Sequence, residues 1–136
     1  MTTGTTRTPT AQYMLPGIRV REYRTAVPLD WSLPDGETIE LFVRELVDPE
    51  RDTAELPLLT YLQGGPGGAN PRPTGRDGWI DEALRDYRVV LVDQRGTGRS
   101  TPVDAEIVAE RGDAGGEFLA CFRADSIVRD LEHVRS

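Results

Sequence analysis

The sequence contains no lysine, a single histidine and a single cysteine, and these scarcities narrow the possible functions. All 16 basic residues are arginines, and 23 acidic residues outnumber them, which gives a formal net charge of −7. An acidic chain without a dense basic cluster is poorly suited to nucleic acid or an anionic membrane surface, so we expect neither as a partner. Because Cys121 cannot form an internal disulfide, a reducing compartment is favoured and the expected location is cytoplasmic.

Long apolar stretches are also missing. No run approaches the ~20 residues that cross a bilayer, and the threonine-rich N-terminus lacks the apolar segment of a secretory signal. We expect residues 1–14 to form a disordered tail, because so polar a segment has little to bury. The remaining residues, 15–136, suffice for one domain with a moderate core.

Two segments near the start of this domain, residues 18–27 and 38–47, alternate apolar and polar side chains. Strands with one buried face have this period. Proline and glycine at 34–37 predict a turn between them, so we expect an antiparallel hairpin that is half exposed. The arginines of the first segment fall on its polar face, which we interpret as solvated: Arg19, Arg21 and Arg24.

Two later segments, residues 56–62 and 87–92, are continuous apolar runs. Runs of this kind are typical of strands that are covered on both faces. The 24 residues between them, 63–86, leave room for a crossover, and residues 78–85 have helical spacing with Asp77 placed as a cap. The predicted fold class is therefore α/β, with an antiparallel hairpin leading into a parallel β-α-β sheet.

The last third of the chain divides into a polar part and an amphipathic part. Residues 101–116 are irregular and rich in glycine, which predicts a loop, whereas residues 117–136 return to helical spacing. We interpret His133 as a surface residue of that helix and Cys121 as a small packed side chain, because neither has a partner for nucleophilic catalysis.

A glycine-rich segment follows the first apolar run and reads Gln63-Gly64-Gly65-Pro66-Gly67-Gly68. Glycines let backbone N–H groups approach a bound group closely, and Pro66 stiffens the loop. One such donor aimed at a developing oxyanion lowers the barrier by about 3–4 kcal/mol. On composition alone a flexible turn remains the alternative. A phosphate-binding P-loop is excluded because its lysine is missing.

A second glycine-containing segment follows the next apolar run and reads Asp93-Gln94-Arg95-Gly96-Thr97-Gly98-Arg99-Ser100. Gly96 and Gly98 permit a sharp reversal of the backbone. Asp93 and Arg95 can brace the turn through charge-assisted hydrogen bonds. We interpret these residues as a scaffold that shapes the wall of a site, rather than as groups that carry out chemistry.

Together the two segments resemble the proline iminopeptidase family of serine peptidases, which have the α/β-hydrolase fold. Members carry His-Gly-Gly-Pro-Gly after the third strand and Asp-Gln-Arg-Gly-x-Gly-x-Ser after the fourth. The resemblance extends over about residues 15–136. Gln63 stands where histidine is usual, as it does in some relatives, and this departure leaves the fine substrate preference open.

The resemblance implies that the backbone of Gly64 and Gly65 forms one side of an oxyanion hole, with the Gly65 N–H as donor. It implies a site wall made by Gln63, Pro66, Gly67, Asp93, Gln94, Arg95, Gly96, Gly98 and Ser100. None of the four serines lies in the Gly-x-Ser-x-Gly that holds the nucleophile. We therefore expect the N-terminal portion of an α/β-hydrolase domain, lacking nucleophile elbow and cap, inactive alone, with the strand at 56–62 on an open sheet edge.

The function implied by the resemblance is that of a serine aminopeptidase. Such an enzyme releases an N-terminal proline, or another residue, from peptides with a free N-terminus, and it needs no metal or cofactor. One alternative is another α/β-hydrolase, such as an esterase or epoxide hydrolase. A second alternative is a non-catalytic domain that binds a partner through the exposed sheet edge. The oligomeric state is left open.

Overall fold

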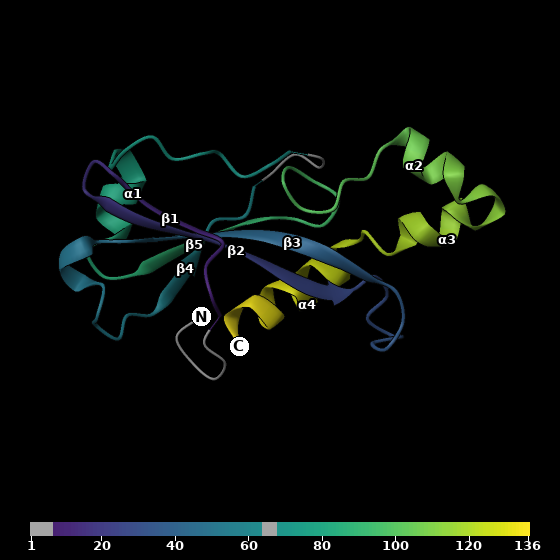
Figure 1. Cartoon of the computed structure of the whole chain (residues 1–136), viewed down its shortest axis with the longest axis horizontal. Coiled ribbons are helices and arrows are strands. Elements are labelled where there is room, and N and C mark those ends of the chain that lie inside the picture. Colours follow the sequence, from purple (N-terminus) through teal and green to yellow (C-terminus); the bar gives the residue numbers. More distant parts are fainter. Residues whose placement is uncertain (1–6, 64–67) are drawn as a thin grey trace.

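The computed structural model describes residues 7–63 and 68–136. Its centre is a mixed sheet of five strands in the order β1-β2-β3-β5-β4, flanked by helices (Figure 1). The predicted α/β class is confirmed. The strands are β1 (Ala11–Leu15), β2 (Ile18–Pro28), β3 (Thr38–Val47), β4 (Leu58–Thr60) and β5 (Arg88–Asp93). The helices are α1 (Gly78–Ala83), α2 (Ala105–Glu110), α3 (Gly115–Ala120) and α4 (Ala124–Arg135), with short 3-10 turns at Pro49–Arg51 and Gly112–Ala114.

The parallel pair predicted from the two apolar runs is present. β4 and β5 run parallel, with Leu58 opposite Arg88 and Thr60 opposite Val90, and α1 lies in the crossover between them. Within the described residues β4 has β5 as its one neighbour, so the predicted edge position is confirmed. β4 is nevertheless shorter than the expected strand at 56–62 and only half-buried, so complete cover on both faces was wrong for this strand.

β5 explains why the sheet has helices on two sides. All six of its residues are buried. Val89 and Leu91 pack with residues of α1 in one apolar cluster, the α1-side cluster. Val90 and Val92 pack with Val134 of α4 in another, the α4-side cluster. The continuous apolar run therefore corresponds to a strand whose two faces enter two different cores, as predicted.

Part of the predicted tail is ordered as a strand. β1 pairs with β2 along its whole length, from Ala11 opposite Glu22 to Leu15 opposite Ile18. Gly17, with φ +73°, supplies the left-handed residue of the short connection. Leu15 and Tyr13 pack against the α1-side cluster, which gives the segment enough apolar contact to order it. The expectation of disorder was therefore wrong for residues 11–14.

The hairpin is more buried than its alternating pattern suggests. β3 lies between β2 and β5, and every residue from Leu41 to Val47 is buried. The expected half-exposed hairpin was therefore wrong for β3, because an inner strand is covered on both faces. The solvated arginine face was also partly wrong: Arg24 is exposed, but Arg19 and Arg21 are half-buried and pair with Asp52 at 3.4 and 2.5 Å.

The expected loop at 101–116 contains α2 and the start of α3, and the expected single helix at 117–136 is interrupted between α3 and α4. Asp104 begins α2, because its carboxylate accepts the Ile107 N–H at 2.9 Å. Asp77 occupies the N-cap of α1 without a side-chain capping bond. In Figure 1, α2 and α3 project beyond one end of the sheet. Of the helices described, none is both long and apolar enough to cross a membrane.

Candidate functional site

The candidate site lies where β4 and β5 end, because both glycine-rich segments begin there. Four of the residues expected to form it, Gly64, Gly65, Pro66 and Gly67, lie outside the described residues. Gln63, which precedes them, is half-buried. The geometry of the site is therefore given by the flanks of the first segment and by the whole of the second.

Hydrogen bonds tie Asn70, two residues after the first segment, to the end of β5, where the second segment starts. The backbone N–H of Asn70 donates to Asp93 Oδ1 at 3.0 Å, and the Asn70 side-chain Nδ2 donates to the carbonyl of Val92 at 2.6 Å. The other oxygen of Asp93 accepts the Arg99 N–H at 2.9 Å. Asp93, predicted to brace the turn, thus binds both Asn70, just after the first segment, and Arg99 of the second segment.

Two glycines make the second segment compact. Gly96 and Gly98 have φ of +82° and +51°, so the predicted reversal is confirmed. A Cβ on Gly98 would collide with the Asp93 carboxylate and lie 2.7 Å from the Cβ of Ala69. A Cβ on Gly96 would lie 3.2 Å from the ring of Phe122. The missing side chain of Gly98 therefore leaves room for Ala69, which follows the first segment, and that of Gly96 leaves room for Phe122.

Ser100 is a structural serine. Its Oγ donates to the carbonyl of Asp93 at 2.6 Å and accepts the Phe42 N–H at 2.9 Å, and the residue is buried. Gln94 contributes its carbonyl, which accepts both the N–H and the hydroxyl of Thr97. These bonds fix the second segment against β3 and leave the Ser100 hydroxyl fully engaged within the fold.

Arg95 points away from the glycine turn into the protein. Its guanidinium pairs with both carboxylate oxygens of Asp130 on α4, each at 2.7 Å. It also donates to the backbone carbonyls of Leu29, Cys121 and Pro28. Arg95 and Asp93 therefore brace different partners, and Arg95 connects the second segment to α4 and to the β2–β3 turn.

Three residues that hold the site together were not predicted from the sequence: Asn70, Asp130 and Trp31. The indole N–H of Trp31 donates to Asp130 Oδ1 at 2.9 Å. Asn70 stands two residues after the last glycine of the first segment, which is the one local signal that could have marked it. Asp130 occupies a helix with charged neighbours and has no such signal. Its role follows only from the contact with Arg95.

A hollow of about 260 Å³ borders the described flank of the first segment. Tyr61, just after β4, stacks on Trp79 of α1 with ring centroids 5.3 Å apart, and both rings are partly exposed. Asn70, Pro71 and Ile80 also line this hollow. The lining is mixed, because Arg72, Thr74 and Asp77 contribute polar groups beside the rings. The carboxyl ends of parallel strands are where ligands of open α/β sheets commonly bind.

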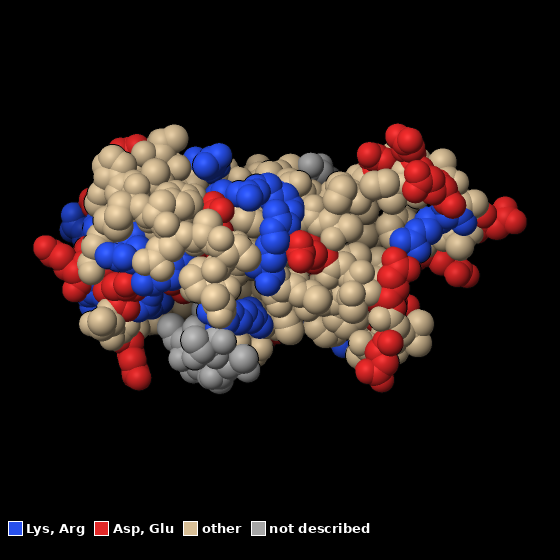
Figure 2. Space-filling model, in the orientation of Figure 1, with Lys and Arg blue, Asp and Glu red and all other residues tan. Residues whose placement is uncertain are grey.

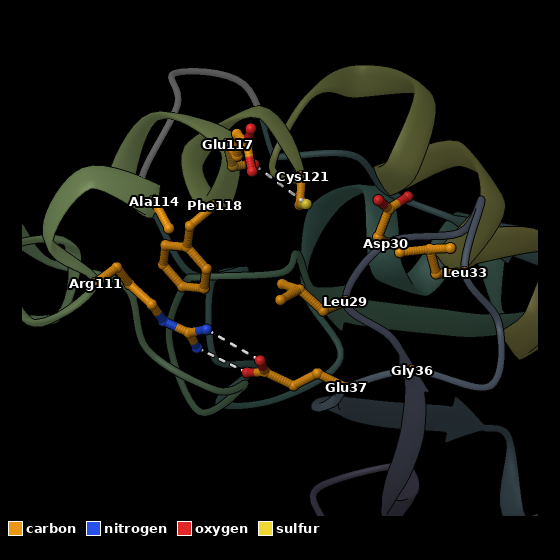
Figure 3. Close-up of a pocket in the computed structure, with 10 residues that line it drawn as sticks. All are labelled: Leu29, Asp30, Leu33, Gly36, Glu37, Arg111, Ala114, Glu117, Phe118 and Cys121. Atoms are coloured by element: carbon orange, nitrogen blue, oxygen red, sulfur yellow. Dashed lines mark hydrogen bonds and ion pairs between the residues drawn. The ribbon is translucent and has the colours of Figure 1, made fainter.

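A second hollow, of about 270 Å³, lies between the β2–β3 turn and α3 (Figure 3). Glu37 and Arg111 close one side of it through two hydrogen bonds of 2.7 and 3.0 Å. These bonds hold the pKa of the Glu37 carboxyl below its usual value. Arg111 also lies over the Phe118 ring, 4.2 Å from its centroid.

Cys121 lines the same hollow but is not activated. Burial raises the pKa of its thiol, and its Sγ donates to the carbonyl of Glu117 at 3.5 Å (Figure 3). The thiolate, which is the nucleophilic form, is therefore disfavoured. The side chain also packs on the α4-side cluster, which supports its interpretation as a packed residue.

His133 is less exposed than expected for a surface helix residue. Its Nε2 lies 3.1 Å from the Thr25 hydroxyl, and its ring is 6.2 Å from that of Trp31. Burial, with a smaller effect from Arg7, lowers the pKa of the imidazole. Its hydrogen-bonded neighbour is a strand hydroxyl on β2, so the ring is engaged in packing α4 on the sheet.

Comparison with known proteins places these features in context. No family model matches the chain. A proline iminopeptidase of Aeromonas sobria is 51% identical over 125 residues, which are 90% of this chain and 29% of that protein. A proline iminopeptidase of Aspergillus aculeatus is 44% identical over 121 residues, 86% of this chain and 27% of that protein. The predicted resemblance is confirmed: over nearly its whole length, this chain is similar in sequence to part of the proline iminopeptidases, as a fragment of that family would be.

Proposed function

We propose that this chain is the N-terminal portion of an α/β-hydrolase that acts as a serine aminopeptidase and releases N-terminal proline, or another residue, from peptides. The observation that carries the proposal is the bond between Asn70 N–H and Asp93, which ties the chain just after the first glycine-rich segment to the start of the second, at the carboxyl ends of parallel strands. Ligands of open α/β sheets bind at this position. The similarity to two proline iminopeptidases points to the same chemistry.

In this proposal the backbone N–H of Gly65, with Gly64 beside it, stabilises the oxyanion of the tetrahedral intermediate. Asp93, Arg95 and Ser100 support the site through the buried hydrogen bonds described above, without touching substrate. The nucleophile, acid and base are supplied by polypeptide of the longer protein, because the described serines and His133 form no triad with one another.

The charge distribution supports a substrate with a free, positively charged N-terminus. Figure 2 shows acidic side chains gathered over the end of the molecule where α2 and α3 project. Four exposed carboxylates belong to this end: Glu106, Glu110, Asp113 and Glu117. The turn between β2 and β3 adds Asp35, whereas the nearby Glu37 is paired with Arg111. A negative surface raises the local concentration of cationic ligands and disfavours anionic ones.

Hydrolysis of proline p-nitroanilide by the longer gene product that contains this chain tests the proposal. We expect release of nitroaniline, loss of activity after reaction with an organophosphate, and no cleavage of the N-acetylated substrate, whose terminus carries no charge. The 136-residue chain alone is the matched control and is expected to be inactive. Cleavage of p-nitrophenyl esters or epoxides, with no cleavage of the prolyl amide, would instead favour another α/β-hydrolase activity.

A further inference from the structure

The strongest unassigned feature is Asn70, which is tied to the end of β5 by both its backbone and its side chain. We propose that Asn70 is a positioning residue for the peptidase reaction, an inference that rests on the proposed function. By holding the chain at residues 68–70 against β5, it fixes the point from which the glycine-rich segment approaches the reacting group.

The first support is the direction of the two bonds. The Asn70 N–H meets the carboxylate of Asp93, and Asn70 Nδ2 meets the carbonyl of Val92, the preceding residue of β5. Two bonds to consecutive residues fix both the position and the rotation of Asn70. The residue is 7% exposed, so water does not compete freely for either bond.

The second support is the close packing around this anchor. Gly98 has no side chain, and the space a Cβ would need is filled by Asp93 and Ala69. Asp93 is also held from the other side by the Arg99 N–H. Because a close-packed contact of this kind has little free volume, a shift of Asn70 passes to Ala69 and Gly68 rather than being absorbed.

The third support is the side-chain oxygen of Asn70, for which the described residues provide no hydrogen-bond donor. Asn70 Oδ1 is buried and has no hydrogen-bond partner within the part of the chain that the structure describes. A buried polar group without a partner is costly, so the stability of the described fold does not by itself account for this oxygen. It fits a residue that places the neighbouring segment.

The test is Asn70→Ala in the longer, active protein, with Thr60→Val as the matched control. Thr60 Oγ1 also donates to a β5 carbonyl, that of Val90, at 2.8 Å, but it does not hold the glycine-rich segment. Active sites are titrated with an organophosphate, so that kcat is obtained per active molecule. We expect N70A to lower kcat about 10- to 100-fold with KM changed less than about 3-fold, and T60V to leave both unchanged.

The outcomes separate the two proposals. If the wild-type protein does not release proline, the proposed function fails. If it does, and N70A keeps the wild-type kcat per titrated site, the positioning role is overturned. Equal losses in N70A and T60V overturn it as well. Should N70A not fold, Asn70→Asp takes its place, because a carboxylate of nearly the same size cannot donate to Val92 O. If neither variant folds, the role is structural and the proposal is wrong.

Discussion

The guanidinium of Arg95 and the carboxylate of Asp130 form a two-pronged ion pair 35 residues apart in the sequence, with both N–O distances 2.7 Å. Their side chains are 0% and 3% exposed. Trp31 donates to the same carboxylate, and three backbone carbonyls accept from the guanidinium. A buried pair is tolerated when its remaining polar atoms are satisfied in this way. The pair therefore sets the position of α4 relative to the end of β5.

Removing one partner of this pair should be strongly destabilising. We expect Asp130→Ala to reduce the free energy of unfolding by about 3–5 kcal/mol, because it leaves the Arg95 guanidinium buried without its counter-charge. Glu132→Ala on the same helix is the control. It removes an ion pair with Arg135 whose side chains are largely exposed, and it should cost less than about 1 kcal/mol. Urea unfolding measures both, and equal losses would contradict the assignment.

Substituting Gly98 and Gly78 distinguishes the cost of backbone strain from the cost of close packing. Their φ angles are nearly the same, +51° and +52°, but a Cβ on Gly78 meets nothing within 4 Å, whereas one on Gly98 meets Asp93 and Ala69. Gly78→Ala should cost about 1–2 kcal/mol of unfolding free energy from the left-handed conformation alone. Gly98→Ala should cost about 1–3 kcal/mol more because of overpacking. Thermal or urea unfolding of the two variants gives the comparison. Similar losses of unfolding free energy would show that Asp93 and Ala69 can move to accommodate a Cβ on Gly98.

The sheet could be predicted because its strands carry a direct sequence signal. A run such as Val89 to Val92 has no polar face, and a strand of that kind must be covered on both sides. The 24 residues between the two runs leave room for the crossover that parallel strands need. α2 was missed although Asp104 is a typical N-cap, because the neighbouring glycines suggested a loop.

The site could be predicted only in part, because its anchors depend on long-range contacts. Alternation placed Arg21 on the polar face of β2, but it could not reveal that Asp52, from a later loop, covers that face. In the same way Asp130 is an ordinary helix residue until Arg95 reaches it. Asn70 acquires its role from Asp93, 23 residues later. Local patterns fix which side a residue faces, whereas its partner depends on the fold.

His133 gives a direct test of how closely α4 packs on the sheet. Burial lowers the pKa of its imidazole, with a smaller contribution from the positive charge of Arg7. It is the only histidine of the chain, so a proton NMR titration needs no assignment. We expect an apparent pKa below about 6.5, the usual value. A value at or above 6.5 would show that the ring is solvated.

The same shift predicts how stability depends on pH. Since the folded state favours the neutral ring, this contribution is fully present above about pH 6.5 and is lost as the pH falls through the lowered pKa of the folded state. The wild-type chain should therefore lose more unfolding free energy between pH 7.5 and pH 5.5 than His133→Gln, which has no titrating group there. Parallel losses in the two proteins would show that the ring does not contribute to the pH dependence.

Arg21 and Asp52 predict a second loss of stability, at more acidic pH. Their two hydrogen bonds of 2.5 and 2.7 Å lower the pKa of Asp52 to about 2. The ionised carboxylate therefore contributes fully above about pH 3.9, and this contribution disappears as the pH falls toward 2. Asp52→Asn should cost about 1–2 kcal/mol at pH 7, allowing for solvent screening, and much less at pH 2.5. Asp35→Asn, at an exposed turn position, is the control. If D52N is less stable than the wild type by the same free energy of unfolding at every pH, the shape of the Asp52 side chain, rather than its charge, accounts for its contribution.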